Sequence, residues 1–356
     1  MDSRTFAQHR VPRFSLGKLW WQAGCGSLVI LALIGLVNLL VDPFDLRFAP
    51  NLSLPRMEAM RPINTALWSL GEFRQIPQKE KETATMIILG DSLAQQLTGG
   101  VTRNRSQTMG DDVRVINLSI GGASYEEMMD TLRYELPEFP SLKTVVLGVP
   151  LERLGEMGHQ RTTEVYEIPS RPWKYLLNLK ILSYSIGLLY NSTPPKDSPA
   201  ATDEEIDTTP ANSGEASAQN DVLWGSAGAV TIEKAFAKRI RLVKAPLALQ
   251  RVRNELTPLA MQLRQRHIQL FFFIPPLNPY IKGVFEQTQG AADVKYLDEL
   301  SKIGVVLDYA MNQPANITYR FRDPAHLDAD VAHQVMLDLL QRVQTQPAAP
   351  AANSAP

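Results

Sequence analysis

The chain has 356 residues, of which 44% are hydrophobic, so it is long enough for one large domain with appendages or for two small domains. Its formal net charge is -1, whereas a broad nucleic-acid interface needs a clustered excess of basic residues, so this class of partner is excluded. The single cysteine, Cys25, excludes an intrachain disulfide and a cysteine-based zinc site.

Residues 19–41 form an apolar run without a charged residue, which is long enough to span the hydrocarbon core of a bilayer. Basic residues precede the run and acidic residues follow it, so the positive-inside rule predicts a cytoplasmic segment 1–18 and an exported remainder. No small-residue cleavage site closes the run, which argues against a cleaved signal peptide. The sequence therefore predicts a single-pass anchor in the inner (cytoplasmic) membrane, with the main domain in the periplasm or otherwise outside the cytoplasm.

After a proline-rich connector at 42–84, short apolar runs alternate with longer amphipathic segments through residues 85–345. The runs are rich in β-branched residues and are expected to form strands buried on both faces of a parallel sheet. We expect strands at 85–89, 113–118, 144–149, 268–274 and 305–309. We expect helices at 92–98, 123–136, 229–267, 288–302 and 326–344. This alternation predicts an α/β layered domain whose ligands bind at the carboxyl ends of the strands.

Two segments do not follow this pattern. Residues 192–220 are rich in proline, small polar residues and acids, and the tail at 346–356 is rich in proline and alanine. Such sequences cannot bury enough apolar surface to offset the entropy lost on folding. We therefore expect a disordered insertion within the domain and a disordered C-terminal tail.

The tripeptide Gly90-Asp91-Ser92 stands where the first expected strand meets its helix. A serine hydroxyl becomes a useful nucleophile when a tight turn holds it beside a base and beside the amides of a helix N-terminus. Aspartate and serine are also common helix N-caps, so the tripeptide alone fits a purely structural cap equally well.

A pair of glycines, Gly121 and Gly122, follows the second expected strand. Glycines let a backbone N–H approach a ligand closely, as an oxyanion donor must. The alternative is an ordinary turn, with Ser124 as the N-cap of the next helix.

Near the C-terminus, Asp323 and His326 lie three residues apart, before and inside the expected first turn of the last helix. This spacing allows the carboxylate to orient the imidazole, which can then act as a base towards a serine and as an acid towards a leaving group. Asp323 is alternatively an N-cap. A metal site is a further alternative, because His326, Asp330 and His333 are spaced to share one helical face.

In this order the three motifs resemble those of the SGNH/GDSL hydrolase superfamily. The resemblance implies a three-layer flavodoxin-like fold with a parallel sheet and without a cofactor or a metal ion. It further implies that Ser92 is the nucleophile and that Asp323 and His326 are its acid and base partners. Gly122 is the implied oxyanion glycine, and Gly121 is the second choice.

One motif departs from the family pattern. The family carries a Gly-x-Asn-Asp block after its third strand, and the asparagine donates to the oxyanion. The matching stretch here, VVLGVPLERL, has Gly148 but no asparagine. Asn278, which follows the fourth expected strand on the same sheet edge, is a candidate substitute donor.

The membrane anchor narrows the resemblance to SGNH-like proteins of bacterial envelope polymer modification, such as those of alginate O-acetylation and of teichoic acid D-alanylation. This implies a serine acyltransferase or esterase acting on O-acyl groups, acetyl in the first place, of an envelope glycan or exopolysaccharide. The implied partners are the polysaccharide or acyl donor and a multi-pass membrane acyltransferase. Because the block-three asparagine is missing, a scaffold or binding protein with weak or no activity is the alternative.

Overall fold

The computed structural model describes residues 16–44, 46, 65–98, 106–109, 113–155, 166, 168, 171–191, 245–323 and 325–346. The chain divides into two compact units. The first consists of Met1–Glu58 and Ile168–Ser198, and the second consists of Ala59–Glu167 and Pro199–Pro356. The segments expected to be disordered, 192–220 and the tail from residue 347 onward, lie outside the described residues.

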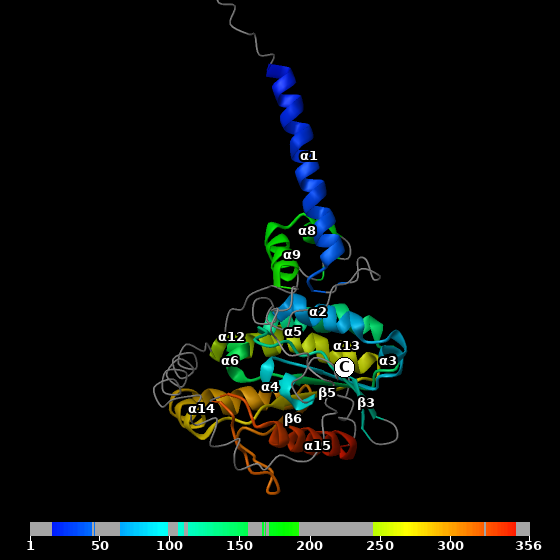
Figure 1. Ribbon diagram of the computed structural model, residues 1–356. Coiled ribbons are helices and arrows are strands. Elements are labelled where there is room, and N and C mark those ends of the chain that lie inside the picture. Colours follow the sequence, from blue (N-terminus) through cyan, green and yellow to red (C-terminus); the bar gives the residue numbers. More distant parts are fainter. Residues whose placement is uncertain are drawn as a thin grey trace, which may run out of the picture. The chain divides into compact units, whose positions relative to one another are not determined.

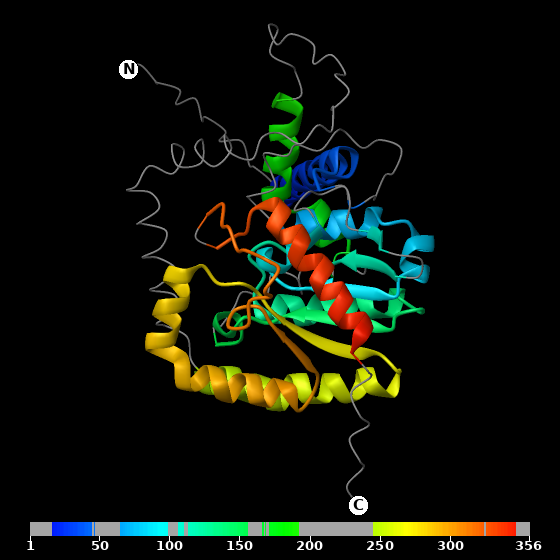
Figure 2. The same ribbon diagram turned by 90° about the horizontal axis from the view of Figure 1, so that it is seen from below.

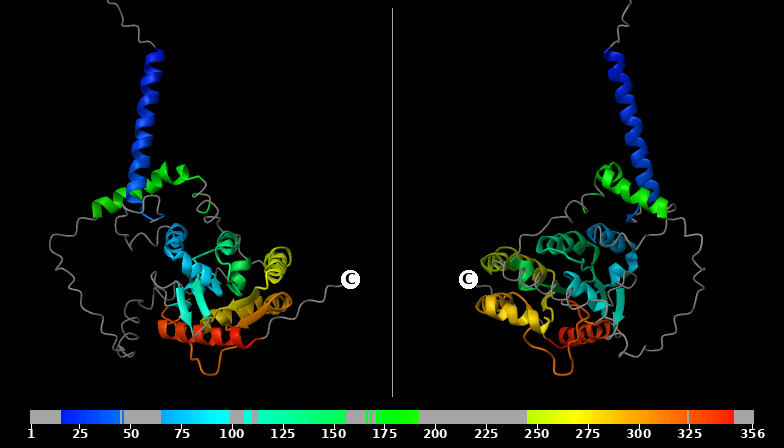
Figure 3. Two further views of the ribbon diagram at one scale, coloured as in Figure 1. Left: turned by 90° about the vertical axis from the view of Figure 1, so that its right-hand side faces the viewer. Right: turned by 60° about the vertical axis from the view of Figure 1, so that its left-hand side comes forward.

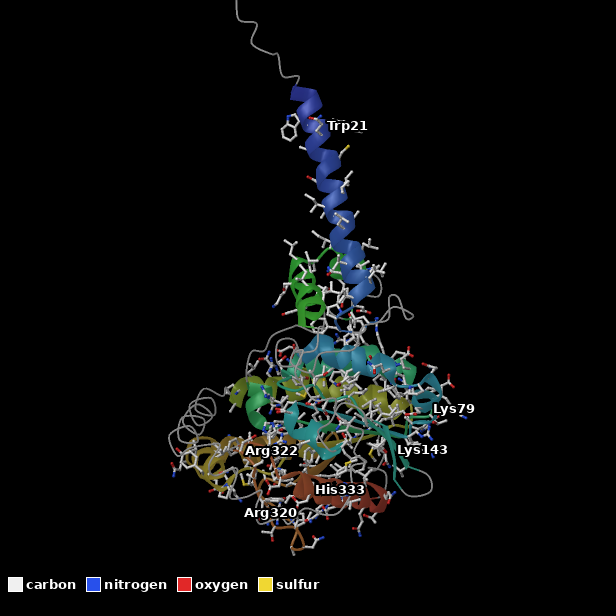
Figure 4. The ribbon with its side chains drawn as sticks, viewed as in Figure 1. Trp21, Lys79, Lys143, Arg320, Arg322 and His333 are labelled. Atoms are coloured by element: carbon white, nitrogen blue, oxygen red, sulfur yellow. The ribbon has the colours of Figure 1, made fainter. Side chains whose placement is uncertain are left out.

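The first unit is built on helix α1, Leu16–Val41, with the short helices α8, Trp173–Leu176, and α9, Leu179–Asn191, beside one of its ends (Figures 1 and 3). Within α1, the stretch Trp20–Val41 has a mean hydropathy of 2.4. It is long and apolar enough to cross a membrane, as the run at 19–41 predicts. Most of its side chains are exposed, including Trp21 near the N-terminal end (Figure 4).

Residues 168–191 belong to this first unit, although the sequence places them within the α/β domain at 85–345. The hydroxyl of Tyr175 donates to Asp42 Oδ1 at 2.9 Å, and the rings of Phe44 and Tyr184 meet edge to face at 5.3 Å. These contacts bind α8 and α9 to the residues that immediately follow α1. They join segments far apart in the sequence, which explains why strand and helix periodicity did not indicate them.

The second unit contains a six-stranded sheet in the order β2-β3-β1-β4-β5-β6. All neighbouring strands pair in parallel except β2, which runs antiparallel to β3 at the edge. The strands are β1 Met86–Leu89, β2 Ser106–Met109, β3 Val113–Asn117, β4 Thr144–Gly148, β5 Gln269–Ile274 and β6 Val305–Asp308. The five expected parallel strands are thus confirmed, whereas the polar edge strand β2 was not expected.

Each face of the sheet has its own hydrophobic core, because side chains alternate along every strand. Ile87 and Leu89 of β1 face one core, and Met86 and Ile88 face the other. The first core is covered by helices α2 Thr65–Gln75, α5 Tyr125–Glu135, α12 Ala245–Arg251, α13 Thr257–Gln265 and α14 Pro279–Ser301. The second is covered by α4 Ser92–Gln95 and α15 Ala329–Thr345, and α15 crosses the sheet in Figure 2. The expected α/β layering is therefore present.

The folded α/β unit also begins earlier than the boundary expected at residue 85. Helix α2 and helix α3, Gln78–Thr83, lie within the expected connector at 42–84. Phe73 is fully buried in the first core, and the ammonium group of Lys81 pairs with Glu135 of α5 at 3.2 Å. These short helices carry too few residues for a clear apolar period, so only their tertiary contacts identify them.

Candidate functional site

The Ser92 turn joins β1 directly to α4. Asp91 is the N-cap of α4, and its Oδ1 accepts a hydrogen bond from the backbone N–H of Leu93 at 2.9 Å. Ser92 is the first residue of the helix and is partly exposed. Since the aspartate provides the cap, the serine hydroxyl is not needed for that purpose.

Two glycines allow α4 to lie close against the sheet at this point. A Cβ placed on Gly90 would come within 2.5 Å of the Cβ of Ala94, and one on Gly148 would come within 3.1 Å of the same atom. Gly90 follows β1 and Gly148 ends the neighbouring β4. The start of the helix is therefore packed onto the carboxyl ends of two adjacent parallel strands, which is where ligands of such sheets bind.

A buried ion pair fixes Asp91 from a third element. The Nε of Arg153, on the short helix α6, Leu151–Gly155, donates to Asp91 Oδ2 at 2.7 Å. The side chains of Asp91 and Arg153 are 3% and 12% exposed. Arg153 lies in the stretch VVLGVPLERL, which contains no asparagine. No sequence pattern indicates this pair, because the two residues are 62 positions apart.

The loop after β3 lies beside the Ser92 turn. Leu118 N–H donates to the carbonyl of Ile88 at 2.7 Å, and Ile120 N–H donates to the carbonyl of Gly90 at 3.0 Å. These bonds extend the pairing of the two strands past their ends, so this loop and the Ser92 turn leave the sheet side by side.

Gly121 and Gly122 occupy a tight turn in that loop. Ala123 N–H donates to the carbonyl of Ile120 at 2.9 Å, and Gly122 has a φ of +70°, which favours glycine. A Cβ on Gly121 would lie 3.2 Å from Oε1 of Gln95 on α4. Gly121, one of the two expected oxyanion glycines, therefore lies next to the helix that begins at Ser92.

Ser124 is confirmed as the N-cap of α5. Its hydroxyl accepts from the backbone N–H of Glu127, and the Glu127 carboxylate accepts from the N–H of Ser124, so the two residues form a capping box.

Asn117, at the end of β3, connects this loop to α4 and was not singled out from the sequence. Its side-chain nitrogen donates to the carbonyl of Ala94 at 3.0 Å and to the hydroxyl of Thr98 at 3.1 Å. Its side-chain oxygen accepts from the N–H of Ser119 at 2.9 Å. The residue is fully buried, and buried amides with several partners position the backbone around them.

Asp323 and His326 form the expected carboxylate–imidazole pair. His326 Nδ1 lies 2.9 Å from Asp323 Oδ2 and 3.0 Å from Oδ1, and the carboxylate also accepts from the backbone N–H groups of Ala325 and His326. Burial alone would raise the pKa of Asp323, but the hydrogen bonds from His326 and from the two amides outweigh it and lower the pKa to about 2. The carboxylate is therefore ionised throughout the physiological range and favours the tautomer that carries its proton on Nδ1.

The position of this pair relative to the last helix differs from the expectation. α15 begins at Ala329 and its N-cap is Asp328, so His326 precedes the helix and Asp323 is not its cap. Instead, an isolated bridge between Phe321 and Leu327 closes a small loop around the pair. The closure explains the difference, because the backbone around His326 pairs across the loop instead of continuing as a helix.

This change removes the basis of the metal alternative, since His326 does not share a helical face with Asp330 and His333. The carboxylate of Asp330 is paired with the guanidinium of Arg320. Among the described residues, no group of three or more His, Cys, Asp or Glu side chains is close enough together to hold a metal ion.

The loop of His326 is attached to the short 3-10 turn that follows α4, the helix that begins at Ser92. The backbone N–H of Leu327 donates to Oε1 of Gln96 at 2.9 Å across 231 positions of sequence. Leu327 and Leu97 are both buried in the second core. No hydrogen bond joins the Ser92 hydroxyl to the His326 imidazole in the described part of the chain, and such bonds often tighten only when substrate is bound.

The side chain of Asn278 takes part in a different contact, at the start of another helix. It is the N-cap of α14, and its side-chain oxygen accepts from the N–H of Tyr280 at 3.0 Å. The side-chain oxygen of Asn278, the residue expected to replace the missing asparagine, therefore caps α14.

No protein-family model matches the chain, and no curated protein matches its sequence. The site's chemistry is therefore defined by its own residues: a serine at a helix start, glycines beside it, and an Asp–His pair whose carboxylate is ionised and whose loop is bonded to Gln96, directly after that helix.

Proposed function

We propose that the chain is a membrane-anchored, extracytoplasmic serine acyltransferase or esterase of the SGNH type. Its proposed substrates are O-acyl groups, acetyl in the first place, of a cell-envelope glycan or exopolysaccharide. The observation that carries the proposal is the hydrogen bond from Leu327 N–H to Gln96, because it attaches the base-bearing loop to the residue that directly follows the helix Ser92–Gln95. Two motifs that are remote in sequence thereby become parts of one local structure.

The strand order supports the same proposal. When the antiparallel edge strand is set aside, the parallel strands follow the order β3-β1-β4-β5-β6. Numbered along the chain, this is the 2-1-3-4-5 order of flavodoxin-like sheets, whose ligands bind where the strand order reverses beside the first strand. Ser92 follows the first parallel strand and therefore borders that position, and Gly121 and Gly122 follow the strand on the other side of β1.

The proposed chemistry follows from the hydrogen bonds of the pair. Because Asp323 engages Nδ1 of His326, Nε2 is the nitrogen available to take the proton of Ser92 as its oxygen attacks the acyl carbonyl. The amides of Ser92 and Gly122 are the proposed donors to the oxyanion. The imidazolium then gives its proton to the leaving alcohol, and an acceptor hydroxyl or water takes the acyl group from Ser92 by the same steps in reverse.

The anchor sets the proposed location. α1 is the proposed single membrane span, with the N-terminus in the cytoplasm and the α/β unit in the periplasm or its equivalent. In that setting a multi-pass membrane acyltransferase is the proposed source of acyl groups, as in the envelope systems that the sequence resembles.

Turnover of an activated acetyl ester tests this proposal. We expect the full-length protein in detergent to hydrolyse p-nitrophenyl acetate, and we expect Ser92→Ala to reduce turnover to background while its circular dichroism stays unchanged. Equal turnover by the two proteins would refute the proposal.

A second candidate function is a non-catalytic scaffold or binding protein of envelope polymer assembly. Arg153, paired with Asp91, occupies the region where the family's oxyanion asparagine is expected, and this observation favours the alternative. Binding of an envelope glycan with equal affinity by wild type and Ser92→Ala, without ester turnover by either, is the result that this alternative predicts.

A further inference from the structure

The end of α1 is bonded to the junction between α8 and α9 within the first unit. The side-chain nitrogen of Asn38 donates to the carbonyls of Leu176, at 2.7 Å, and Asn178, at 3.2 Å. The hydroxyl of Ser185 donates to Asn38 Oδ1 at 3.0 Å. Asn38 is fully buried and lies in the last turn of the apolar stretch that ends at Val41. The junction is therefore held at the level where the apolar stretch of α1 ends (Figure 3).

Among the described side chains of α9, one apolar face is buried, and the outward face carries large apolar residues beside the exposed Ser183. Ile181 and Tyr184 are 4% and 8% exposed and pack within the unit. Leu179 and Ile186, seven positions apart and hence on one face of the helix, are 67% and 53% exposed. A helix of a water-exposed domain would place polar residues on that outward face.

The neighbouring helix adds exposed apolar surface of the same kind. Trp173 at the start of α8 is 58% exposed, and Leu177 just after it is 40% exposed. Tryptophan is enriched where a protein meets the boundary between lipid and water, because its ring has an apolar body and a polar N–H.

The charges of this segment are of one sign. Residues 168–191 contain three basic residues, Arg171, Lys174 and Lys180, and no acidic residue. Basic side chains beside an apolar helix face are typical of helices that lie on anionic lipid.

We propose that α8 and α9 lie in the headgroup region of the membrane that α1 spans, with Trp173, Leu179 and Ile186 inserted among the lipids. The occupant of the exposed face is thus the bilayer surface itself. The bonds of Asn38 hold this face at the end of the membrane span, where lipid is already present, and the basic residues complement anionic headgroups. The inference rests on the proposed span of α1 and is independent of the proposed catalysis.

Site-directed spin labelling of the full-length chain tests the inference. The only cysteine, Cys25, is first replaced by serine, and single cysteines are then introduced at Leu179, Ile186 and, as controls, Leu33 and Lys302. Leu33 is an exposed residue in the middle of α1, and Lys302 is an exposed residue of the α/β unit. The labelled proteins are reconstituted in vesicles of phosphatidylethanolamine and phosphatidylglycerol. Accessibility to oxygen, which partitions into lipid, is compared with accessibility to a water-soluble nickel chelate.

We expect the oxygen-to-nickel ratio at Leu179 and Ile186 to be several-fold higher than at Lys302 and lower than at Leu33, as befits a position near the headgroups. A ratio equal to that at Lys302 would show that the face is in water and would overturn the inference. Low accessibility to both reagents would show that protein covers the face, and would also overturn it. If Leu33 itself reports water, α1 is not in the bilayer and the inference fails with it. Every outcome is independent of ester turnover.

Discussion

The turn that carries Ser92 and the loop that carries His326 are held in place by different means. The turn is fixed from several sides, because Gly90 leaves no room for a Cβ, Arg153 pairs with Asp91, and Asn117 bonds the helix behind it. The loop is organised mainly by its own residues, through the bonds of Asp323, and a side-chain hydrogen bond to Gln96 attaches it to α4 and the turn that follows.

The difference is consistent with the proposed roles of the two residues. A nucleophile at a helix start needs an exact backbone position, which close packing provides. A general base needs the right tautomer and enough freedom to approach the nucleophile when substrate arrives, which a local carboxylate partner provides. Each variant below removes one contact or one side chain from the Ser92 turn or from the His326 loop.

Loss of the base is expected to have the largest effect. We predict that His326→Ala lowers kcat for ester hydrolysis by about 10³-fold or more, equivalent to about 4 kcal/mol, as for other members of such units. Steady-state kinetics of the full-length protein provide the measurement. His333→Ala is the matched control, because His333 is exposed on α15 (Figure 4), and we expect it to keep wild-type activity. Equal losses in both variants would contradict the assignment of the base.

Loss of the buried ion pair between Arg153 and Asp91 is expected to have the next largest effect, on the free energy of unfolding. Arg153→Met leaves the Asp91 carboxylate buried without its cation, and we expect the free energy of unfolding to fall by about 3 kcal/mol. Arg133→Met is the control, because Arg133 pairs with Asp130 at 3.1 Å on the surface with its side chain 72% exposed. We expect that control to lose less than about 1 kcal/mol. Urea denaturation followed by circular dichroism measures both, and similar losses would mean that the pair does not fix the turn.

A methyl group added at the Ser92 turn should lower the stability of the fold by somewhat less than the loss of the ion pair does. Gly90→Ala places a Cβ 2.5 Å from that of Ala94, and overpacking of this kind destabilises by about 2 kcal/mol. Gly283→Ala is the contrast, because a Cβ there meets nothing within 4 Å and the residue lies inside α14. Alanine is the better helix former, so this variant should gain up to about 1 kcal/mol. Melting temperatures that move in the same direction would contradict the close packing of α4.

The smallest effect concerns the pH dependence of the His326 loop. The folded state lowers the pKa of Asp323 from 3.8 to about 2, so its ionised form stabilises the fold fully above pH 4. That stabilisation, about 1 to 2 kcal/mol, is lost as the pH falls from 4 towards 2. We expect Asp323→Asn to lose stability at neutral pH and to show a shallower decline in acid.

Denaturation at a series of pH values measures this effect. Asp298→Asn, at an exposed position of α14, is the control and should keep the wild-type profile. Identical acid profiles for Asp323→Asn and the wild type would show that the carboxylate is not held as described.

The difference between local contacts and contacts between distant elements also explains what could be predicted from the sequence. The five parallel strands are continuous apolar runs, and their pattern is local, so all five were predicted to within one or two residues. The bond between Asp323 and His326 spans three positions, and it was also predicted. Arg153, Asn117 and Gln96 bond to partners on other elements, and no spacing rule indicates them.

Two further differences between the expected and the observed structure also arise from contacts between distant residues. β2 is a short edge strand with the mostly polar sequence SQTM, so it lacks the apolar run that indicates the central strands. The loop around His326 contains an aspartate and a proline that suit a helix start, yet its ends are paired by the bridge between Phe321 and Leu327, and the helix begins only at Ala329. In both cases a tertiary contact decided a structure that local propensity left open.

Covalent labelling of Ser92 is the most direct test of the central claim. A fluorophosphonate reacts with an activated serine as its hydroxyl oxygen displaces fluoride from phosphorus, and the adduct remains on the residue. We predict that the full-length wild-type protein and the surface control Ser301→Ala are labelled alike, with the adduct located on Ser92 by peptide mass spectrometry, and that Ser92→Ala is not labelled. Equal labelling of wild type and Ser92→Ala, or no labelling of either, would contradict the account.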